Sequence, residues 1–244
     1  MSNSNRVILF LLTITLLAAF ATPVFATTYN PGVTVGQYVK YGNFVGTGQG
    51  FEQFNDYDWL KLQVTNVSGT EVTLLSTGQF RNGTAIPGND TTNIWDVATG
   101  NQNGVPSTEG PIIAANLNQG DPIPPPNTYS VNQTNTALFL GVSRSVNVLD
   151  VDIFTESYNT TLSYVYDRAS GMLLQSISQT TTLAQPQPVK STYAYTVIET
   201  NIFGSPVPTP TPSPTVPEFP SLTILPLVMI VLLTASVFLR RKSR

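Results

Sequence analysis

The sequence predicts an all-β domain outside the cytosol, followed by a C-terminal transmembrane helix. Three observations lead to this prediction. Apolar and polar residues alternate over much of residues 27–203, the chain begins with a short apolar run, and it ends with an uncharged apolar run before basic residues. Alternation with a period of two is typical of half-buried β-strands. We therefore expect a curved antiparallel sheet, in a half-barrel or sandwich-like arrangement.

Residues 1–26 have the three parts of a secretory signal peptide. Arg6 lies in a short polar start, residues 7–20 are apolar, and Val24 and Ala26 are small enough for the pocket of a signal peptidase. We expect cleavage after Ala26, with an uncleaved signal anchor as the alternative. In both cases the chain that follows leaves the cytosol.

The C-terminal apolar run is long enough to cross a membrane. Residues 222–239 are 18 residues without a charge, and a helix of that length spans about 27 Å at about 1.5 Å per residue. The basic tail, residues 240–244, follows directly and is expected to remain in the cytoplasm. A buried core helix is the alternative for such a run.

The charge and composition of the exported part exclude several classes of function. Residues 27–218 hold 6 basic and 14 acidic residues, a net charge of −8, which argues against binding nucleic acid. The chain has no cysteine and no histidine. Disulfides, thiolate metal sites and nucleophiles paired with histidine are therefore excluded.

Two hairpins are predicted in residues 27–203. In the first, apolar residues alternate along 60–64 and 71–74 on either side of the turn Ser68-Gly69. In the second, residues 162–166 and 172–182 flank a turn at 167–171. A last strand is expected over 191–200, and a slip in the apolar phase along 146–154 predicts a β-bulge.

Residues 83–126 form a loop-rich insert between these halves, dense in Gly, Pro, Asn and Asp. A structureless run of this length is uncommon in a compact domain, so short elements or functional loops are expected within it. Residues 111–118 fit either one or two helical turns, with Pro111 at the start, or a short strand.

The candidate sites fall into three groups. Aromatic side chains that suit a sheet core, and that also suit stacking on sugars or lining an apolar groove, are Tyr38, Tyr41, Trp59, Tyr164, Tyr166, Tyr193 and Tyr195. Trp95, within the insert, is the candidate ligand contact. Asn-x-Ser/Thr triplets, at least one of which we expect to be glycosylated, begin at Asn66, Asn82, Asn89, Asn132 and Asn159.

Two Asp-x-Asp pairs, at 56/58 and 150/152, each place both carboxylates on one face of a strand, as calcium ligands would be. Neither pair belongs to a complete calcium loop, so solvated strand ends are the simpler interpretation. Paired carboxylates also serve glycoside hydrolysis, but 14 acidic residues bring some pair together by chance. We predict no metal, no cofactor and no enzymatic activity.

Residues 204–221 form a Pro/Thr-rich stalk that ends in a short motif. Alternating prolines favour an extended polyproline II conformation, which over about 15 residues spans roughly 45 Å at about 3.1 Å per residue. The hydroxyl groups between the prolines are candidate sites for O-linked sugars. The motif itself consists of Pro217, Glu218, Phe219, Pro220 and Ser221.

Four segments resemble a family of uncharacterised exported surface proteins of archaea: residues 35–41 (VGQYVKY), 115–121 (ANLNQGD), 144–147 (RSVN) and 164–174 (YVYDRASGMLL). The resemblance implies a domain of curved antiparallel strands and a C-terminal sorting segment, but no activity. More loosely, the order of elements is similar to the half-open barrels of bacterial lipoprotein carriers, in which the insert would plug an apolar groove.

The C-terminal motif, with the apolar run and the basic tail, resembles the PEF-type sorting signals read by archaeosortases. This resemblance implies cleavage near the motif and transfer to a lipid, while retention of the helix as a permanent anchor stays open. We expect a single-pass, glycosylated, non-enzymatic envelope or adhesion protein on an archaeal cell surface. The alternative is a module that holds a lipid or other apolar molecule in a groove of the sheet. Expected partners are the membrane, a signal peptidase, an archaeosortase, and lipid, glycan or surface-layer components.

Overall fold

The structure, a computed structural model, describes residues 29–48, 50–107, 110–124, 129–183 and 187–204. The predicted signal peptide, sorting motif, transmembrane helix and basic tail lie outside these ranges. Within them, no helix combines the length and the apolar character needed to cross a bilayer.

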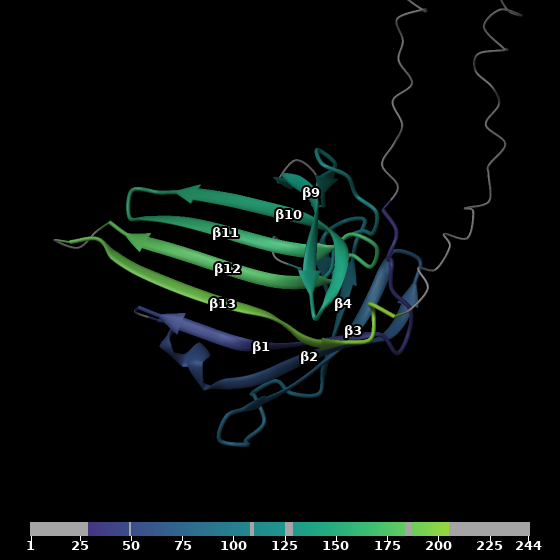
Figure 1. Cartoon of the computed structure of the whole chain (residues 1–244), viewed down its shortest axis with the longest axis horizontal. Coiled ribbons are helices and arrows are strands. Elements are labelled where there is room, and N and C mark those ends of the chain that lie inside the picture. The colour runs from purple at the N-terminus through teal and green to yellow at the C-terminus, as the bar shows by residue number, and fades with distance from the viewer. Residues whose placement is uncertain (1–28, 49, 108–109, 125–128, 184–186, 205–244) are drawn as a thin grey trace, which may run out of the picture. The chain divides into compact units, whose positions relative to one another are not determined.

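Eleven strands form one large antiparallel sheet in the order β6-β5-β4-β3-β2-β1-β13-β12-β11-β10-β9, and β7 pairs separately with β8 (Figure 1). A 3-10 helix, η1 (Glu52–Asp56), follows β1. The strands are β1 (Tyr38–Thr47), β2 (Tyr57–Ser68), β3 (Glu71–Phe80), β4 (Thr91–Asp96), β5 (Asn101–Gln102), β6 (Val105–Pro106), β7 (Pro122–Ile123), β8 (Tyr129–Ser130), β9 (Gln133–Phe139), β10 (Val142–Phe154), β11 (Tyr158–Asp167), β12 (Leu173–Thr182) and β13 (Val189–Thr200). The all-β, antiparallel prediction is confirmed.

Both predicted hairpins are present, and a long-range pairing joins the two halves. β2 pairs with β3 up to Ser68↔Glu71, and β11 pairs with β12 across the turn at 167–171. β1 pairs with β13, with Val39 opposite Thr200 and Thr47 opposite Thr192. The first and last strands of the sheet therefore lie side by side at its centre.

This register gives the sheet two distinct ends. β1 begins and β13 ends at one end of the sheet. We call it the insert end because residues 110–124, a later part of the insert, cover it. β10 and β12 end, and β11 and β13 begin, at the other end, which we call the hairpin end (Figure 1). The chain leaves the sheet at the insert end, after Thr200.

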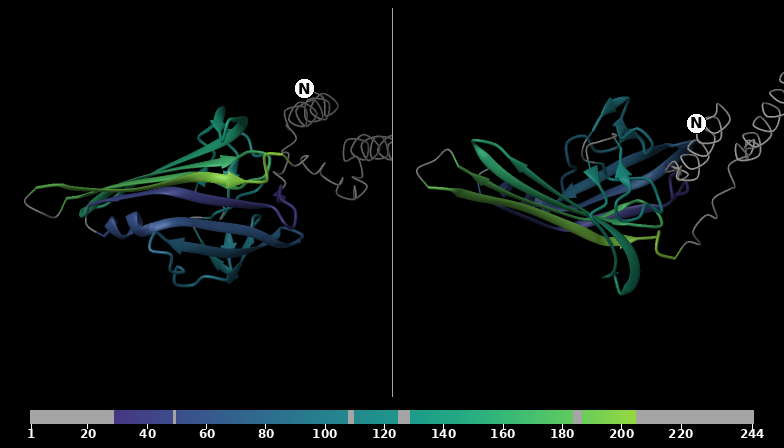
Figure 2. Two further views of the ribbon diagram at one scale, coloured as in Figure 1. Left: turned by 60° about the horizontal axis from the view of Figure 1, so that its bottom comes forward. Right: turned by 90° about the horizontal axis from the view of Figure 1, so that it is seen from above.

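The sheet is strongly curved. Trp95 on β4 and Leu149 on β10 line the same small cavity, although seven strand positions separate them. In a flat sheet that separation would be about 34 Å, at about 4.8 Å per strand. Figure 2 shows the two halves of the sheet crossing each other instead of lying in one plane. The face on the inside of this curve is called the inner face below.

The β-bulge predicted in residues 146–154 is wrong. β10 pairs with β11 without a register shift from Val146↔Asp167 to Phe154↔Asn159. The apolar phase slips because Val146 is buried on the face opposite to Leu149 and Val151, so this strand has an apolar residue on each face. The irregular pairings lie elsewhere, at Lys40/Tyr41, Gly42/Val45, Tyr57/Trp59, Val64/Asn66 and Val165/Tyr166.

The insert does contain short elements, as expected. β4, β5, β6 and β7 lie within residues 83–126. Of the two interpretations of residues 111–118, the strand is closer to the structure: Ile112 forms an isolated antiparallel bridge with Met172, and no helical turn is present there. Ile112, Ile113, Ala114 and Leu117 are buried, so this part of the insert supplies core to the inner face.

Candidate functional site

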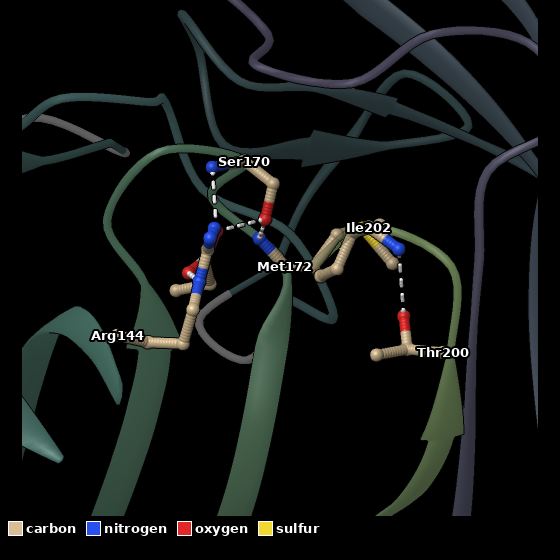
Figure 3. Close-up of polar contacts among 6 residues, drawn as sticks. Arg144, Ser170, Met172, Thr200 and Ile202 are labelled. Atoms are coloured by element: carbon tan, nitrogen blue, oxygen red, sulfur yellow. Dashed lines mark hydrogen bonds and ion pairs between the residues drawn. The ribbon is translucent and has the colours of Figure 1, made fainter. Parts of the chain in front are cut away.

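The turn after β11 is organised by a buried ion pair. Arg144 on β10 donates from Nε and Nη2 to the two carboxylate oxygens of Asp167, at 2.8 and 3.0 Å. The backbone N–H and hydroxyl of Ser170 donate to the same carboxylate at 2.9 and 2.7 Å (Figure 3). The Asp167 side chain is fully buried, so these bonds replace its lost hydration. Arg144 also lies over the ring of Phe203, 5.0 Å from its centroid.

The same turn holds the insert in place. Ile113 N–H donates to Gly171 O at 2.9 Å, and Arg168 donates to Leu117 O at 3.0 Å and to Asn118 Oδ1 at 2.8 Å. Gly171 has φ +76°, and a Cβ there would lie 2.0 Å from Ile113 O. A glycine is therefore required both by the backbone conformation and by the contact. Three of the four segments that carried the family resemblance, 115–121, 144–147 and 164–174, meet at this turn.

The space beneath the insert is almost filled. The cavity between the insert and the sheet has a volume of about 20 Å³, which is room for about one water molecule. Trp95 lines this cavity, is only 8% exposed, and packs against Gly110. Its indole is therefore part of the core, and contact with a ligand larger than water would require the insert to move.

Several predicted aromatic residues are core residues as well. Some of the predicted aromatic residues, Tyr41 among them, also belong to one extended series of ring contacts. Tyr41, Tyr164 and Tyr166 are buried. The series, called the aromatic ladder below, has centroid separations between 5.0 Å for Phe54–Tyr193 and 6.3 Å for Tyr193–Tyr195. Its members are Tyr41, Phe44, Phe51, Phe54, Tyr57, Phe80, Tyr193 and Tyr195. The members nearest the hairpin end, Phe51, Phe54 and Tyr193, are half-buried.

Two aromatic residues near the insert end are covered by lysines. Lys40 Nζ lies 4.8 Å from the Trp59 ring centroid, and Lys61 Nζ lies 4.4 Å from that of Tyr38. Tyr38 donates its hydroxyl to Glu199 at 2.7 Å, and this bond raises the pKa of the tyrosine. The same bond, followed by the charge of Lys40 at 3.5 Å, lowers the pKa of Glu199. These rings are engaged in contacts within the sheet.

The hairpin end exposes large apolar side chains. Phe154 at the β10–β11 turn is 73% exposed, and Tyr158, Leu183 and Val189 beside it are 40–42% exposed. Tyr158 and Val189 share one face of the sheet, because Tyr158, Thr182 and Val189 are consecutive cross-strand partners. Phe154 pairs with Asn159 and therefore projects to the opposite face. Leu183 N–H donates to Ser157 O, so the four residues surround the end of the β10–β11 hairpin. A second exposed apolar group, Leu138, Leu140 and Val142, surrounds the β9–β10 turn at the insert end. Sequence reasoning missed both groups, although the apolar residues directly beside turn residues could have indicated them.

An open depression lies beside the turn that follows β3. Its volume is about 460 Å³, and it is lined by Asp56, Phe80, Arg81, Asn82 and Thr84. The ring of Phe80, at the end of the aromatic ladder, packs edge-on against Tyr57 at 5.1 Å. An aromatic ring, two charged groups and an amide thus line one depression, which is a common composition for a site that binds a polar ligand.

The five predicted glycosylation asparagines differ in how their amides are used. Asn66 and Asn82 are exposed, while Asn159 is half-buried within β11. Asn89 accepts a hydrogen bond from Gly78 N–H at 2.5 Å and donates to Asp90 at 3.4 Å. Asn132 accepts from Asp150 N–H at 2.8 Å. The fold therefore separates five equivalent triplets into distinct environments.

The aspartate pairs do not converge on a common site. Asp150 and Asp152 are exposed on β10 and accept from Ser163 and Thr161 across the strand at 2.7 and 2.8 Å. Asp56 ends η1, and Asp58 is exposed on β2. No three His, Cys, Asp or Glu side chains gather at one point in the part of the chain that the structure describes. The sorting motif, Pro217 to Ser221, lies outside that part.

No protein-family model matches the chain, and searches of the curated proteins and of the solved structures found no significant match.

Proposed function

We propose that the chain is a non-enzymatic archaeal cell-surface protein whose half-barrel sheet contacts envelope material through its hairpin end. Export rests on the signal-like residues 1–26, and anchoring rests on the stalk at 204–221 and the apolar run at 222–239. The PEF-type motif at 217–221 adds an archaeosortase as a processing partner. The family resemblance supports the same location.

The observation that carries this proposal is the position of the exposed apolar surface. Phe154, Tyr158, Leu183 and Val189 lie at the end of the sheet opposite to the point where the chain leaves it. Exposed apolar side chains that gather at one end of a sheet are typical of an interaction surface.

The half-buried part of the aromatic ladder suggests the chemistry of the partner. Phe51 and Phe54, at the 3-10 helix η1, and Tyr193 on β13 form a cluster in which each ring contacts the other two, with Phe54 and Tyr193 stacked at an interplanar angle of 13°. Flat aromatic surfaces bordered by hydroxyl and carboxylate groups suit sugar rings, which have apolar C–H faces and polar edges. A glycan-bearing envelope or surface-layer component is therefore the partner that we propose.

The alternative, a module that carries a lipid inside the sheet, has less support. The inner cavity beneath the insert has a volume of about 20 Å³, far below the 300–1,000 Å³ that small-molecule sites occupy. Native mass spectrometry of the purified chain would revive this alternative if it detected a co-purifying lipid.

The test is binding of the purified full chain, in detergent, to sedimented native cell envelopes. We expect the double variant Phe154→Ser/Tyr158→Ser to lose at least about tenfold in affinity, which corresponds to about 1.4 kcal/mol. Leu138→Ser is the matched control, because Leu138 is 72% exposed at the insert end and should bind normally. Equal binding by all three proteins, or loss only in the control, would contradict the proposal.

A further inference from the structure

The turn that follows β3, residues 80–84, has an unusual combination of backbone and side-chain geometry. Gly83 N–H donates to Phe80 O at 2.9 Å, and Phe80 N–H donates to Thr84 O at 2.8 Å. Gly83 takes the left-handed conformation, with φ +85°, so this is a tight turn with a bulge residue. Phe80, Asn82 and Thr84 all line one depression.

The amide oxygen of Asn82 is held within the turn. Its Oδ1 accepts hydrogen bonds from Thr84 N–H at 2.9 Å and from the Thr84 hydroxyl at 2.7 Å. Both bonds engage the amide oxygen, which a glycan does not substitute. Asn82 is exposed. The two bonds fix its side chain through Oδ1 and do not use Nδ2, the atom that a sugar would join.

The depression provides a surface on which the first sugar could lie. Phe80 precedes Asn82 by two residues and supplies an aromatic ring, while Asp56 and Arg81 supply polar groups at the rim. A pyranose ring buries its apolar C–H face against an aromatic ring and keeps its hydroxyl groups near polar partners. The turn therefore offers both the attachment atom and a platform beside it.

The other four triplets lack this combination. The amide nitrogen of Asn89 donates to Asp90, and its oxygen ties the loop to Gly78. Asn132 caps the backbone of β10 at Asp150, and Asn159 is paired on both sides within the sheet. Asn66 is exposed, but no aromatic side chain adjoins it in the β2–β3 turn, residues 64–73.

We infer that Asn82 is an N-glycosylation site whose first sugar packs on the ring of Phe80. This inference rests on the proposed function, because only an exported chain meets a glycosyltransferase outside the cytosol. The donor is an oligosaccharide linked to a lipid phosphate. Asn82 Nδ2 forms a bond to C1 of the sugar, the C1–O bond to the lipid phosphate breaks with its electron pair on that oxygen, and an amide proton passes to a base of the transferase.

Peptide mass spectrometry of the full chain from its native cells tests the site. We expect residues 1–26 to be absent and Asn82 to be modified. A chain that has lost residues 1–26 but is unmodified at Asn82 overturns the assignment and leaves the export proposal intact. A chain without a glycan that is recovered from the cytosol overturns both, whereas retention of residues 1–26 alone does not, because an uncleaved signal anchor also exports the chain.

The stability of a defined glycoform tests the contact with Phe80. The full chain is produced in a eukaryotic secretory host and trimmed enzymatically to a single N-acetylglucosamine on each modified asparagine. Removing the sugar through Asn82→Gln should lower the Tm by about 2–4 °C, whereas Asn66→Gln, the matched exposed control, should not. In a Phe80→Leu background, which keeps apolar bulk beside Tyr57, the effect of Asn82→Gln should be smaller, because only the loss of the bonds from Thr84 to Asn82 Oδ1 then remains. An equal effect with and without the ring, or no occupancy of Asn82, overturns the inference.

Discussion

The two ends of the sheet differ in how they use polar and apolar groups. At the insert end, the carboxylate of Asp167 is fully buried and accepts four hydrogen bonds, and the cavity between residues 110–124 and the sheet has a volume of only about 20 Å³. At the hairpin end, Phe154 is 73% exposed and the carboxylate of Asp152 faces solvent. The comparison suggests that stability is concentrated at the insert end, while the hairpin end remains available for contact.

The physical reason lies in what covers each end. Residues 110–124 and 201–203 pack on the insert end, where Ile113, Leu117 and Ile202 are buried. The β10–β11 and β12–β13 hairpins extend beyond these segments (Figure 1). Strands with few buried neighbours open locally at low free energy, whereas strands in a sealed core open only with global unfolding.

Removing the carboxylate of Asp167 should have the largest effect on this comparison. Asp167→Ala leaves the guanidinium of Arg144 without its ion-pair partner in a mostly buried position, and breaking such a pair costs about 3–5 kcal/mol. Urea unfolding followed by circular dichroism measures the loss. Asp152→Ala at the hairpin end is the control, with an expected change below about 1 kcal/mol because its bond to Thr161 is exposed. Equal losses at the two ends would contradict the comparison.

Gly171→Ala should have the next largest effect, about 2–4 kcal/mol. The alanine must adopt a φ of +76°, and its Cβ would meet Ile113 O at 2.0 Å, so the insert has to shift. We expect a lower urea midpoint and increased proteolytic cleavage within residues 110–124. A variant with normal stability and an intact insert would show that this turn does not hold the insert in place.

The sequence predicts more of the sheet than of its covering. Alternation identifies the β2–β3 and β11–β12 hairpins because each strand there has one apolar face. The same reasoning fails for β10, where Val146 is buried on one face and Leu149 on the other. A period-two pattern shows only which positions of a strand are apolar. It does not show that a segment distant in the sequence covers them, which is the reason for burial in β10. No local signal pairs Arg144 with Asp167, which are 23 residues apart.

The candidate sites show the same limit. The triplet rule identifies all five asparagines, but only the folded chain shows that the amide of Asn89 is used internally and that Phe80 adjoins Asn82. Trp95 seemed accessible because its segment is rich in loop residues. It is buried because β4 joins the sheet and residues 110–124 fold back over it. Both arrangements depend on contacts between residues far apart in the sequence.

A smaller effect is expected from pH at the insert end. Burial by itself raises the pKa of Asp96, but hydrogen bonds from Thr70, Thr99 and Ala98 N–H outweigh it and lower the pKa below its ordinary value of 3.8. Since the folded pKa is the lower one, this carboxylate stabilises the fold above the unfolded pKa, and the contribution is lost as pH falls through the folded pKa. The stability difference between wild type and Asp96→Asn should thus shrink from pH 7 to pH 3 in urea titrations. A constant difference would contradict this assignment.

The smallest effect on stability is expected at the hairpin end itself. Phe154→Ser should change the free energy of unfolding by less than about 0.5 kcal/mol, because a side chain that is 73% exposed loses little buried contact. Hydrogen exchange should separate the two ends of the same strands, with amides near Phe154 and Tyr158 exchanging through local opening and amides near Val146 and Tyr166 only through global unfolding. If Phe154→Ser were as destabilising as Asp167→Ala, the exposed end would be part of the structural core, and a dedicated contact surface there would lose its physical basis.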